Sequence, residues 1–320
     1  MTDADNGGDT ARRERHARLA AIMQQRLSTR AEFAAMVGSA IAEGRGFAAG
    51  KLGTSQQHWM VYPILRRSVR SPLAVAEFFR SRVAPHALRN AGVFPATPEF
   101  LLRYNDFYVE SVRALDSVGL FLEGDEMESL VVRHYGLERL IHFQDQEPDR
   151  AADGSAGACF LPHLRDARVL IVCPFARLLK ARATAETYEA VWSKLGKRWF
   201  EPASVDALEF PYGVAASTRG RYPDAIGLLD EIRAELDRRS YDVALIGAAG
   251  LAIPLAAHAK ARGKVAIDLG GHLQIVFGVV GKRWRNWSEW RERYFNAHWI
   301  DMPAHYRPED PGVCDEGAYW

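Results

Sequence analysis

The stretch YDVALIGAAGLAIPLAAHAKARGKVAIDLGG, residues 241–271, decides the expected fold. An apolar run of strand length leads into a glycine turn and then into an alanine-rich run typical of a helix. A second apolar run follows and ends at Gly270-Gly271. Strand, helix and strand in this order form a βαβ unit, whose two strands lie parallel in one sheet. The stretch therefore predicts a parallel sheet with glycine turns at its carboxyl edge.

The same alternation extends through much of the chain. Further apolar runs of strand length are FAAGKL (47–52), RVLIVCPF (168–175) and VDALEFPYG (205–213), and helical patterns cover about 176–194, 223–238 and 251–262. Strands that alternate with amphipathic helices are typical of sheets covered on both faces. We therefore predict an α/β fold with a mostly parallel sheet, helices on both faces, a helical N-terminal part and a C-terminal tail docked on the body.

Changes in composition suggest the following organisation. Residues 1–10 are polar and are predicted to be disordered, and residues 11–45 carry a helical pattern. Residues 46–320 form one α/β domain, with a helical insertion at about 70–145 and a polar loop at 144–158. The chain closes on the aromatic pair of Tyr319 and Trp320, which favours a tail packed against the body.

Composition restricts the class of protein. The chain has 320 residues, 48% of them hydrophobic and 25% charged, which is the profile of a soluble globular protein. No apolar run approaches the roughly 20 residues of a membrane span, and the polar N-terminus lacks the apolar core of a signal peptide. Cys159, Cys173 and Cys314 fit neither a disulfide framework nor a zinc pattern. These features predict a cytoplasmic protein.

The charge pattern bears on partners. The formal net charge is +1, so no overall field attracts nucleic acid, and we expect no nucleic-acid partner. Local clusters exist at residues 12–18 and at Arg66, Arg67 and Arg70, and both are interpreted as solvated helix faces. A homo-oligomer remains open.

The two glycine turns are the first candidate for a binding site. Gly247, Gly250, Gly270 and Gly271 let backbone amides approach a phosphate, and a following helix N-terminus favours an anion. The spacing in GAAGLA is not the G-x-G-x-x-G of dinucleotide-binding proteins, and no nucleoside triphosphate loop is present. Tight turns without a ligand are the competing interpretation.

The segment KVAIDLGGHLQIVFGVVGKRW, residues 264–284, adds groups that carry chemistry. Asp268 ends a predicted strand and is the first candidate for a catalytic base, with His272 the second. Lys282 and Arg283 are placed to neutralise a pyrophosphate. The competing interpretation is an ordinary strand-end carboxylate, a surface histidine and two solvated cations.

Other catalytic arrangements find less support. Cys173 ends an apolar strand and is expected to be a buried structural thiol. No G-x-S-x-G motif is present, and the histidines show no metal-ligand spacing, so no metal site is predicted.

Several segments together resemble bacterial glycosyltransferases of the GT-D fold class and their relatives near surface-polysaccharide genes. The matching segments, in order, are FAAGKLGTSQQ (47–57), NAGVFP (90–95), RVLIVCPFARLL (168–179), residues 242–284 and EGAYW (316–320). The resemblance implies a Rossmann-like sheet that binds a nucleotide sugar, usually a UDP-sugar. It also implies transfer of the sugar to an acceptor hydroxyl, such as that of a glycan, in polysaccharide biosynthesis.

One departure from the family pattern affects the expected mechanism. The founding members carry an Asp-x-Glu motif after the first strand, where this chain has Thr54, Ser55 and Gln56. Neutral oxygens are poor ligands for a hard divalent cation, but they can donate hydrogen bonds to phosphate. We expect them, with Gly53 and the cation Lys51, to bind the diphosphate beside the Gly270-Gly271 turn. Mn²⁺ or Mg²⁺ held by carboxylates from elsewhere remains open.

Two other functions stay open on the sequence alone. The missing Asp-x-Glu motif is consistent with a non-catalytic protein that binds a nucleotide or a glycan. The aromatic and basic segment GKRWRNWSEWRERYF, residues 281–295, is consistent with a scaffold that uses Trp284 and Trp287 as a partner surface.

Overall fold

The computed structural model describes residues 27–122, 126–148, 159–309, 312 and 315–320. The predictions of disorder at 1–10 and of a helix before residue 27 lie outside these residues, as does most of the loop predicted at 144–158, whose described start belongs to a short 3-10 helix, Phe143–Gln146. Within them the chain forms a seven-stranded sheet whose pairings are all parallel. In spatial order its strands are β3 (Leu140–His142), β2 (Ser117–Leu120), β1 (Phe47–Lys51), β7 (Val265–Asp268), β6 (Val243–Ile246), β4 (Arg168–Val172) and β5 (Ser204–Leu208).

Apolar side chains on alternate strand positions fill two separate cores, one on each face of the sheet. In β6, Ala244 and Ile246 belong to one core, while Val243 and Leu245 belong to the other. All four residues are buried, because helices cover both faces. The α/β prediction is therefore confirmed, with a Rossmann-like arrangement that is parallel throughout.

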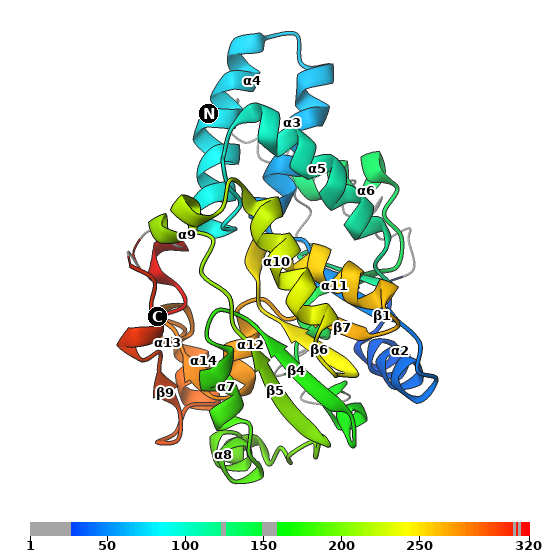
Figure 1. Ribbon diagram of the computed structural model, residues 1–320, viewed down its shortest axis with the longest axis vertical. Helices are drawn as coiled ribbons and strands as arrows, with labels where there is room; N and C mark the ends of the chain where they lie inside the picture. The colour runs from blue at the N-terminus through cyan, green and yellow to red at the C-terminus, as the bar shows by residue number, and fades with distance from the viewer. Residues whose placement is uncertain (1–26, 123–125, 149–158, 310–311, 313–314) are drawn as a thin grey trace, which may run out of the picture.

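The helices divide between the two faces. One core includes buried residues of α3 (Thr54–Ser68), α5 (Pro98–Arg113), α6 (Glu126–Tyr135), α10 (Ala225–Asp237) and α11 (Ala252–Ala261). The other includes residues of α2 (Arg30–Ala42), α7 (Ala176–Arg182), α8 (Ala185–Val191), α12 (His272–Val276), α13 (Lys282–Arg285) and α14 (Ser288–Arg293). Figure 1 shows α10 and α11 beside the strands, while α3, α4 (Pro72–Phe78) and α5 extend beyond the sheet at the top.

The region from 70 to 145 differs from the predicted helical insertion. It contains α4, α5 and α6, but it also supplies β2 and β3, which extend the central sheet beyond β1. These strands have only four and three residues, too few to show a periodic pattern in the sequence. The region is therefore part of the α/β body and not an addition to it.

Local capping sets where two of the helices begin. The helix expected at 176–194 is divided into α7 and α8 at Thr184, whose side chain accepts from the amide of Thr187 and so begins a new helix. The residue that caps α3 is Gly53, so Thr54 and Ser55 do not cap it through their side chains and lie in its first turn.

The chain ends of the described structure are both tied to the body. The amide of Ser28 donates to Leu140 O at 2.9 Å, and Thr29 and Glu32 then form the capping box that begins α2. At the other end, the carbonyl of Ala318 accepts from the amide of Arg283 at 3.0 Å, and the ring of Trp320 packs edge-on against Tyr212 at 5.5 Å. The predicted docking of the C-terminal tail is confirmed.

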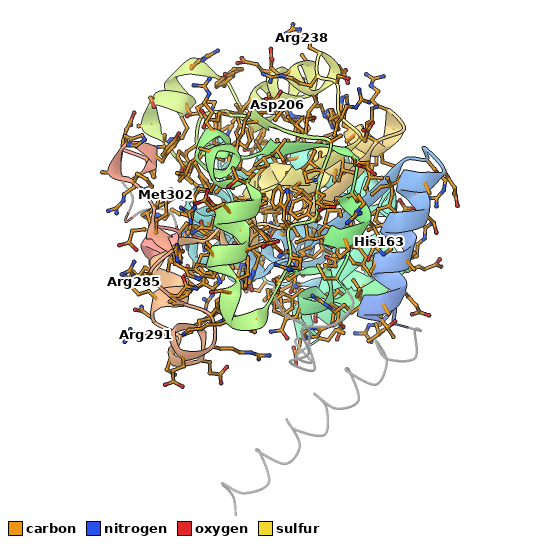
Figure 2. All side chains as sticks on the ribbon, turned by 90° about the horizontal axis from the view of Figure 1, so that it is seen from below. His163, Asp206, Arg238, Arg285, Arg291 and Met302 are labelled. Atoms are coloured by element: carbon orange, nitrogen blue, oxygen red, sulfur yellow. The ribbon has the colours of Figure 1, made fainter. Side chains whose placement is uncertain are left out.

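The outer surface is rich in charged side chains. Figure 2 shows Arg238, Arg285 and Arg291 at the rim of the molecule, around an interior made mostly of carbon. Among the described helices, none combines the length and the apolar character that crossing a bilayer requires.

Candidate functional site

A cavity of about 110 Å³ lies at the carboxyl edge of the sheet. After β4 the chain continues to β5, toward one edge strand of the sheet. After β6 it continues to β7, which lies in the opposite direction across the sheet. Such a change of direction opens a crevice between two strand ends, where ligands of open α/β sheets bind. The residues that line the cavity come from the loops after β4, β5, β6 and β7, from 90–92 and from the tail: Pro174, Phe175, Phe210, Tyr212, Gly213, Val214, Gly247, Ala248, Ala249, Leu251, Gly270, Gly271, Gln274, Asn90, Ala91, Gly92, Tyr319 and Trp320.

The two glycine turns meet at this cavity. A Cβ on Gly247 would lie 3.0 Å from the carbonyl oxygen of Gly270, so the turns pack too closely for a side chain. Gly247, Gly270 and Gly271 line the cavity, whereas Gly250 faces the loop that carries Ala91 and donates its amide to Ala91 O at 3.0 Å. The structure therefore brings three of the four predicted glycines to one cavity.

Gly250 is required by packing, and we expect Gly250→Ala to destabilise the fold by about 2 kcal/mol. Its Cβ would lie 2.5 Å from Val93 Cγ2 and 2.8 Å from Ala91 O, which forces the loop away from the turn. Urea unfolding measures the change. Gly227→Ala in α10 is the control, because its Cβ meets nothing nearer than 3.5 Å and alanine favours a helix. Equal stability of the two variants would contradict this packing.

Three backbone amides of residues that line the cavity lack a hydrogen-bond acceptor among the described residues. Within the part of the chain that the structure describes, the amides of Ala248, Ala249 and Gly271 donate to no acceptor. Ala249 has a φ of 46°, a left-handed conformation that turns the backbone at the end of β6. Successive amides in such a turn, followed by a helix, form an anion-binding concavity.

Aromatic side chains form much of the rest of the wall. Phe175, Phe210, Tyr212, Tyr319 and Trp320 line the cavity, which suits the flat face of a heterocyclic base.

One lining residue, Gln274, carries a buried acceptor without a hydrogen-bond partner in the described chain. The Nε2 of Gln274 donates to Tyr319 O at 3.2 Å and to Val279 O at 3.3 Å. Its Oε1 is buried and accepts no hydrogen bond from the described residues. A buried acceptor without a donor is costly, so Gln274 offers a bond to a ligand N–H.

A buried charged cluster lies beside the cavity, at the ends of β1 and β7. The Nζ of Lys51 is 3.2 Å from Glu147 Oε1 and donates to Leu269 O at 2.9 Å. The Nε2 of His272 is 3.1 Å from the same Glu147 oxygen. The side chain of Glu147 is only 1% exposed. Glu147 thus compensates the charge of Lys51 and also contacts His272, and none of the three lines the cavity.

Asp268 completes this cluster through the backbone. Its two carboxylate oxygens accept from the amides of Gly270 at 2.9 Å and Lys51 at 3.4 Å, so it holds the end of β1 against the glycine turn. Burial raises the pKa of Asp268 from 3.8 to about 6, against the opposing effects of the Lys51 ammonium and the two amides. A carboxyl group with this pKa suits a base that works near neutral pH.

The raised pKa of Asp268 predicts a pH dependence of stability. Because the pKa is higher in the folded state, the contribution is fully present below pH 3.8 and is lost as the pH rises through 6. The difference between the two pKa values corresponds to about 3 kcal/mol. We expect the stability of Asp268→Asn, relative to the wild type, to rise by about this amount between pH 4 and pH 7. Parallel pH profiles in chemical unfolding would disprove it.

Lys282 and Arg283 hold the tail and do not line the cavity. The Nζ of Lys282 is 3.4 Å from Glu316 O, and the guanidinium of Arg283 lies 5.0 Å from the centre of the Tyr319 ring. A Cβ on Gly271 would meet that ring at 2.4 Å. Arg283 and Gly271 therefore both lie against Tyr319, and Arg283 is not among the residues that line the cavity.

The turn after β1 shares the carboxyl edge but not the cavity. Gly53, Thr54, Ser55 and Gln56 open α3, and none of them is a lining residue. The Ser55 Oγ lies 3.5 Å from His86 Nδ1, which lies 3.5 Å from the Nδ2 of Asn90. Asn90 does line the cavity, so this turn reaches it only through two other side chains.

The exposed fractions of Cys173, Trp284 and Trp287 test other predictions from the sequence. Cys173 is fully buried, and burial raises the pKa of its thiol, as expected of a structural cysteine. Trp284 is 0% exposed and packs on Tyr319 and His272, so it belongs to the core and cannot present a partner surface, whereas Trp287 is 38% exposed. The described residues contain no group of three histidine, cysteine, aspartate or glutamate side chains placed to hold a metal.

Glu147 is the residue of this region that the sequence analysis missed. It lies in the polar segment QDQEPD, where no spacing distinguishes it from a solvated loop residue. Its burial depends on a bond from the Arg30 guanidinium to its carbonyl and on the position of β1 beside β7, and no local sequence pattern predicts either of them.

Comparison of the chain with family models, with characterised proteins and with solved structures finds no match.

Proposed function

We propose that the chain is a glycosyltransferase-like enzyme that binds a nucleotide sugar, with a UDP-sugar the favoured donor, and transfers the sugar to an acceptor hydroxyl. The observation that carries the proposal is the cavity between β4, β6 and β7, with its open amides of Ala248, Ala249 and Gly271. The resemblance to GT-D glycosyltransferases supports the choice of donor. A cytoplasmic reaction follows from the same proposal.

Each part of the cavity has a role in this account. The three amides receive the diphosphate, whose charge grows as the sugar leaves. The aromatic wall holds the base, and the Oε1 of Gln274 accepts from the N–H of a uracil ring. Asp268, with its pKa near 6, is the proposed base for the acceptor hydroxyl, and His272 is the second candidate.

The tail has to move for the donor to enter. A cavity of about 110 Å³ is smaller than the roughly 300 Å³ of ordinary ligand sites. Tyr319 lies against Gly271 and Trp320 against Tyr212, so these two rings occupy space that the donor needs. Displacement of the tail would also release Arg283 and Lys282 from their contacts with it, and both cations could then approach the diphosphate.

The cavity offers no ligand set for Mn²⁺ or Mg²⁺. Among its described lining residues there is no carboxylate, and hard divalent cations prefer carboxylate oxygens. No step of the proposed reaction is assigned to a metal.

A panel of UDP-, GDP-, ADP-, CMP- and dTDP-sugars tests the proposal. A donor at about 100 times its dissociation constant stabilises the folded state by about 2.7 kcal/mol, so we expect the matching donor to raise the melting temperature by several degrees. Release of the nucleotide on addition of hydroxyl acceptors, a nucleoside diphosphate or, from a CMP-sugar, CMP, then reports transfer. If no nucleotide sugar stabilises the protein, the proposal fails.

A non-catalytic nucleotide-binding protein is the second candidate. It is favoured by the contacts of Asp268 and His272, which are engaged by backbone amides and by Glu147 and do not line the cavity. This candidate predicts saturable binding of a donor without release of diphosphate for any acceptor. Turnover that is lost in Asp268→Asn would exclude it.

A further inference from the structure

The turn between α3 and α4 carries an exposed segment that the proposed function does not use. Residues 66–74, which we call the α3–α4 tip, are exposed without exception. α3 packs against α4, α5 and α6, and Figure 1 shows α3 and α4 projecting beyond the sheet. The tip is therefore accessible to a large partner.

Apolar side chains gather at the tip. Leu73 is 81% exposed and Val69 is 38% exposed. Among the described residues only one other large apolar side chain, Trp287, is classed as exposed, so two of three such side chains lie within five positions of each other. Single exposed apolar residues are ordinary, but a pair at the end of a projection marks an interaction site.

The same tip is strongly basic. The tip itself contains three arginines and no acidic residue, a formal charge of +3, and residues 75–82 add two arginines and one glutamate, whereas the whole chain has +1. Glu77 is paired with Arg80 at 2.9 Å. Arg67 and Arg70 are paired with no carboxylate of the described chain. The surplus charge is thus concentrated at one end of the molecule.

We propose that the α3–α4 tip docks on the surface of an anionic lipid bilayer. Arginines near such a surface are attracted by its headgroups, while Leu73 and Val69 enter the interfacial layer. Apolar side chains at the extreme end favour a bilayer over nucleic acid, because phosphate contacts gain nothing from leucine. The inference does not rest on the nucleotide-sugar proposal.

Docking at the tip sets the orientation of the molecule. α3 begins directly after β1, at the carboxyl edge, and its 15 residues span about 22 Å. A bilayer at the tip therefore lies about one helix length from the edge that carries the cavity.

Flotation of the full chain with lipid vesicles tests the proposal. We expect it to float with vesicles of 60% phosphatidylcholine and 40% phosphatidylglycerol at 50 mM salt, and to remain behind with pure phosphatidylcholine. Raising the salt to 500 mM should reverse most of the binding. Equal binding to both vesicles, or binding to neither, would overturn the proposal.

Variants separate the contribution of the arginines to vesicle binding from that of the apolar side chain of Leu73. The triple change Arg66→Gln, Arg67→Gln and Arg70→Gln should weaken binding on the order of a hundredfold, and Leu73→Ser on the order of tenfold. The control Arg45→Gln, Arg165→Gln and Arg238→Gln removes the same charge from exposed residues that precede β1, β4 and β6, and should leave binding within about twofold.

Two outcomes would reject a bilayer as the partner. One is an equal loss in the control variant, which would show that only overall charge matters. The other is unchanged binding in Leu73→Ser together with tighter, arginine-dependent binding of a 20-base-pair DNA duplex, which would indicate nucleic acid. Circular dichroism of each variant checks folding, which these exposed positions should not disturb.

Discussion

Replacing Ala249 with aspartate is expected to weaken the binding of a nucleoside diphosphate by about a hundredfold. Ala249 lines the cavity, and its own amide and that of Ala248 donate to no acceptor in the described chain. A carboxylate placed there occupies these amides and repels the incoming diphosphate. Two unit charges about 4 Å apart near a protein surface repel by about 4 kcal/mol, which salt reduces.

Ala249→Asn is the matched control for this change. Aspartate and asparagine have nearly the same shape, and both tolerate the left-handed backbone at this position, where φ is 46°. Asparagine brings no negative charge, so calorimetric titration with UDP should show only a small loss. Equal affinity of the two variants would show that the phosphate lies elsewhere.

Removal of the Glu147 carboxylate is expected to lower the free energy of unfolding by about 4 kcal/mol, the usual cost of breaking a buried ion pair. Its side chain is 1% exposed and that of Lys51 is 14% exposed, so little water can replace the lost partner. His272 loses the same acceptor. Urea unfolding of Glu147→Gln, which keeps the shape, measures the loss.

A double variant shows whether the cost comes from an isolated charge. Lys51→Met with Glu147→Leu removes both members of the pair and replaces them with apolar side chains of similar size. We expect it to recover most of the stability that Glu147→Gln loses, because no uncompensated charge is left. If the losses of stability in Lys51→Met alone and Glu147→Leu alone add up to the loss in the double variant, the two side chains are not coupled.

The convergence of the glycine turns could be predicted from the sequence, because the carboxyl ends of all strands in a parallel sheet meet at one edge. The apolar runs at 243–246 and 265–268 are long enough to be recognised as strands, and they predict that Gly247 and Gly270 lie at that edge. Lys51 and Asp268 also came together there, since both end neighbouring strands.

The detailed contacts of the site depend on long-range structure. No local sequence pattern predicts the order of the strands, which places β7 beside β1. The strands β2 and β3 are too short to show a hydrophobic periodicity. For the same reason the sequence did not show that Lys282 and Arg283 lie outside the cavity, because they contact Glu316 and Tyr319, more than thirty residues later. Glu147 was missed because only tertiary packing buries it.

A crystal structure of the protein with UDP tests the central claim most directly, since it shows the position of every ligand atom. The account predicts the diphosphate against the amides of Ala248, Ala249 and Gly271, the uracil within the aromatic wall, and Tyr319 displaced from Gly271. UDP bound at any other place, or a cavity that stays closed by the tail at saturating UDP, would contradict it.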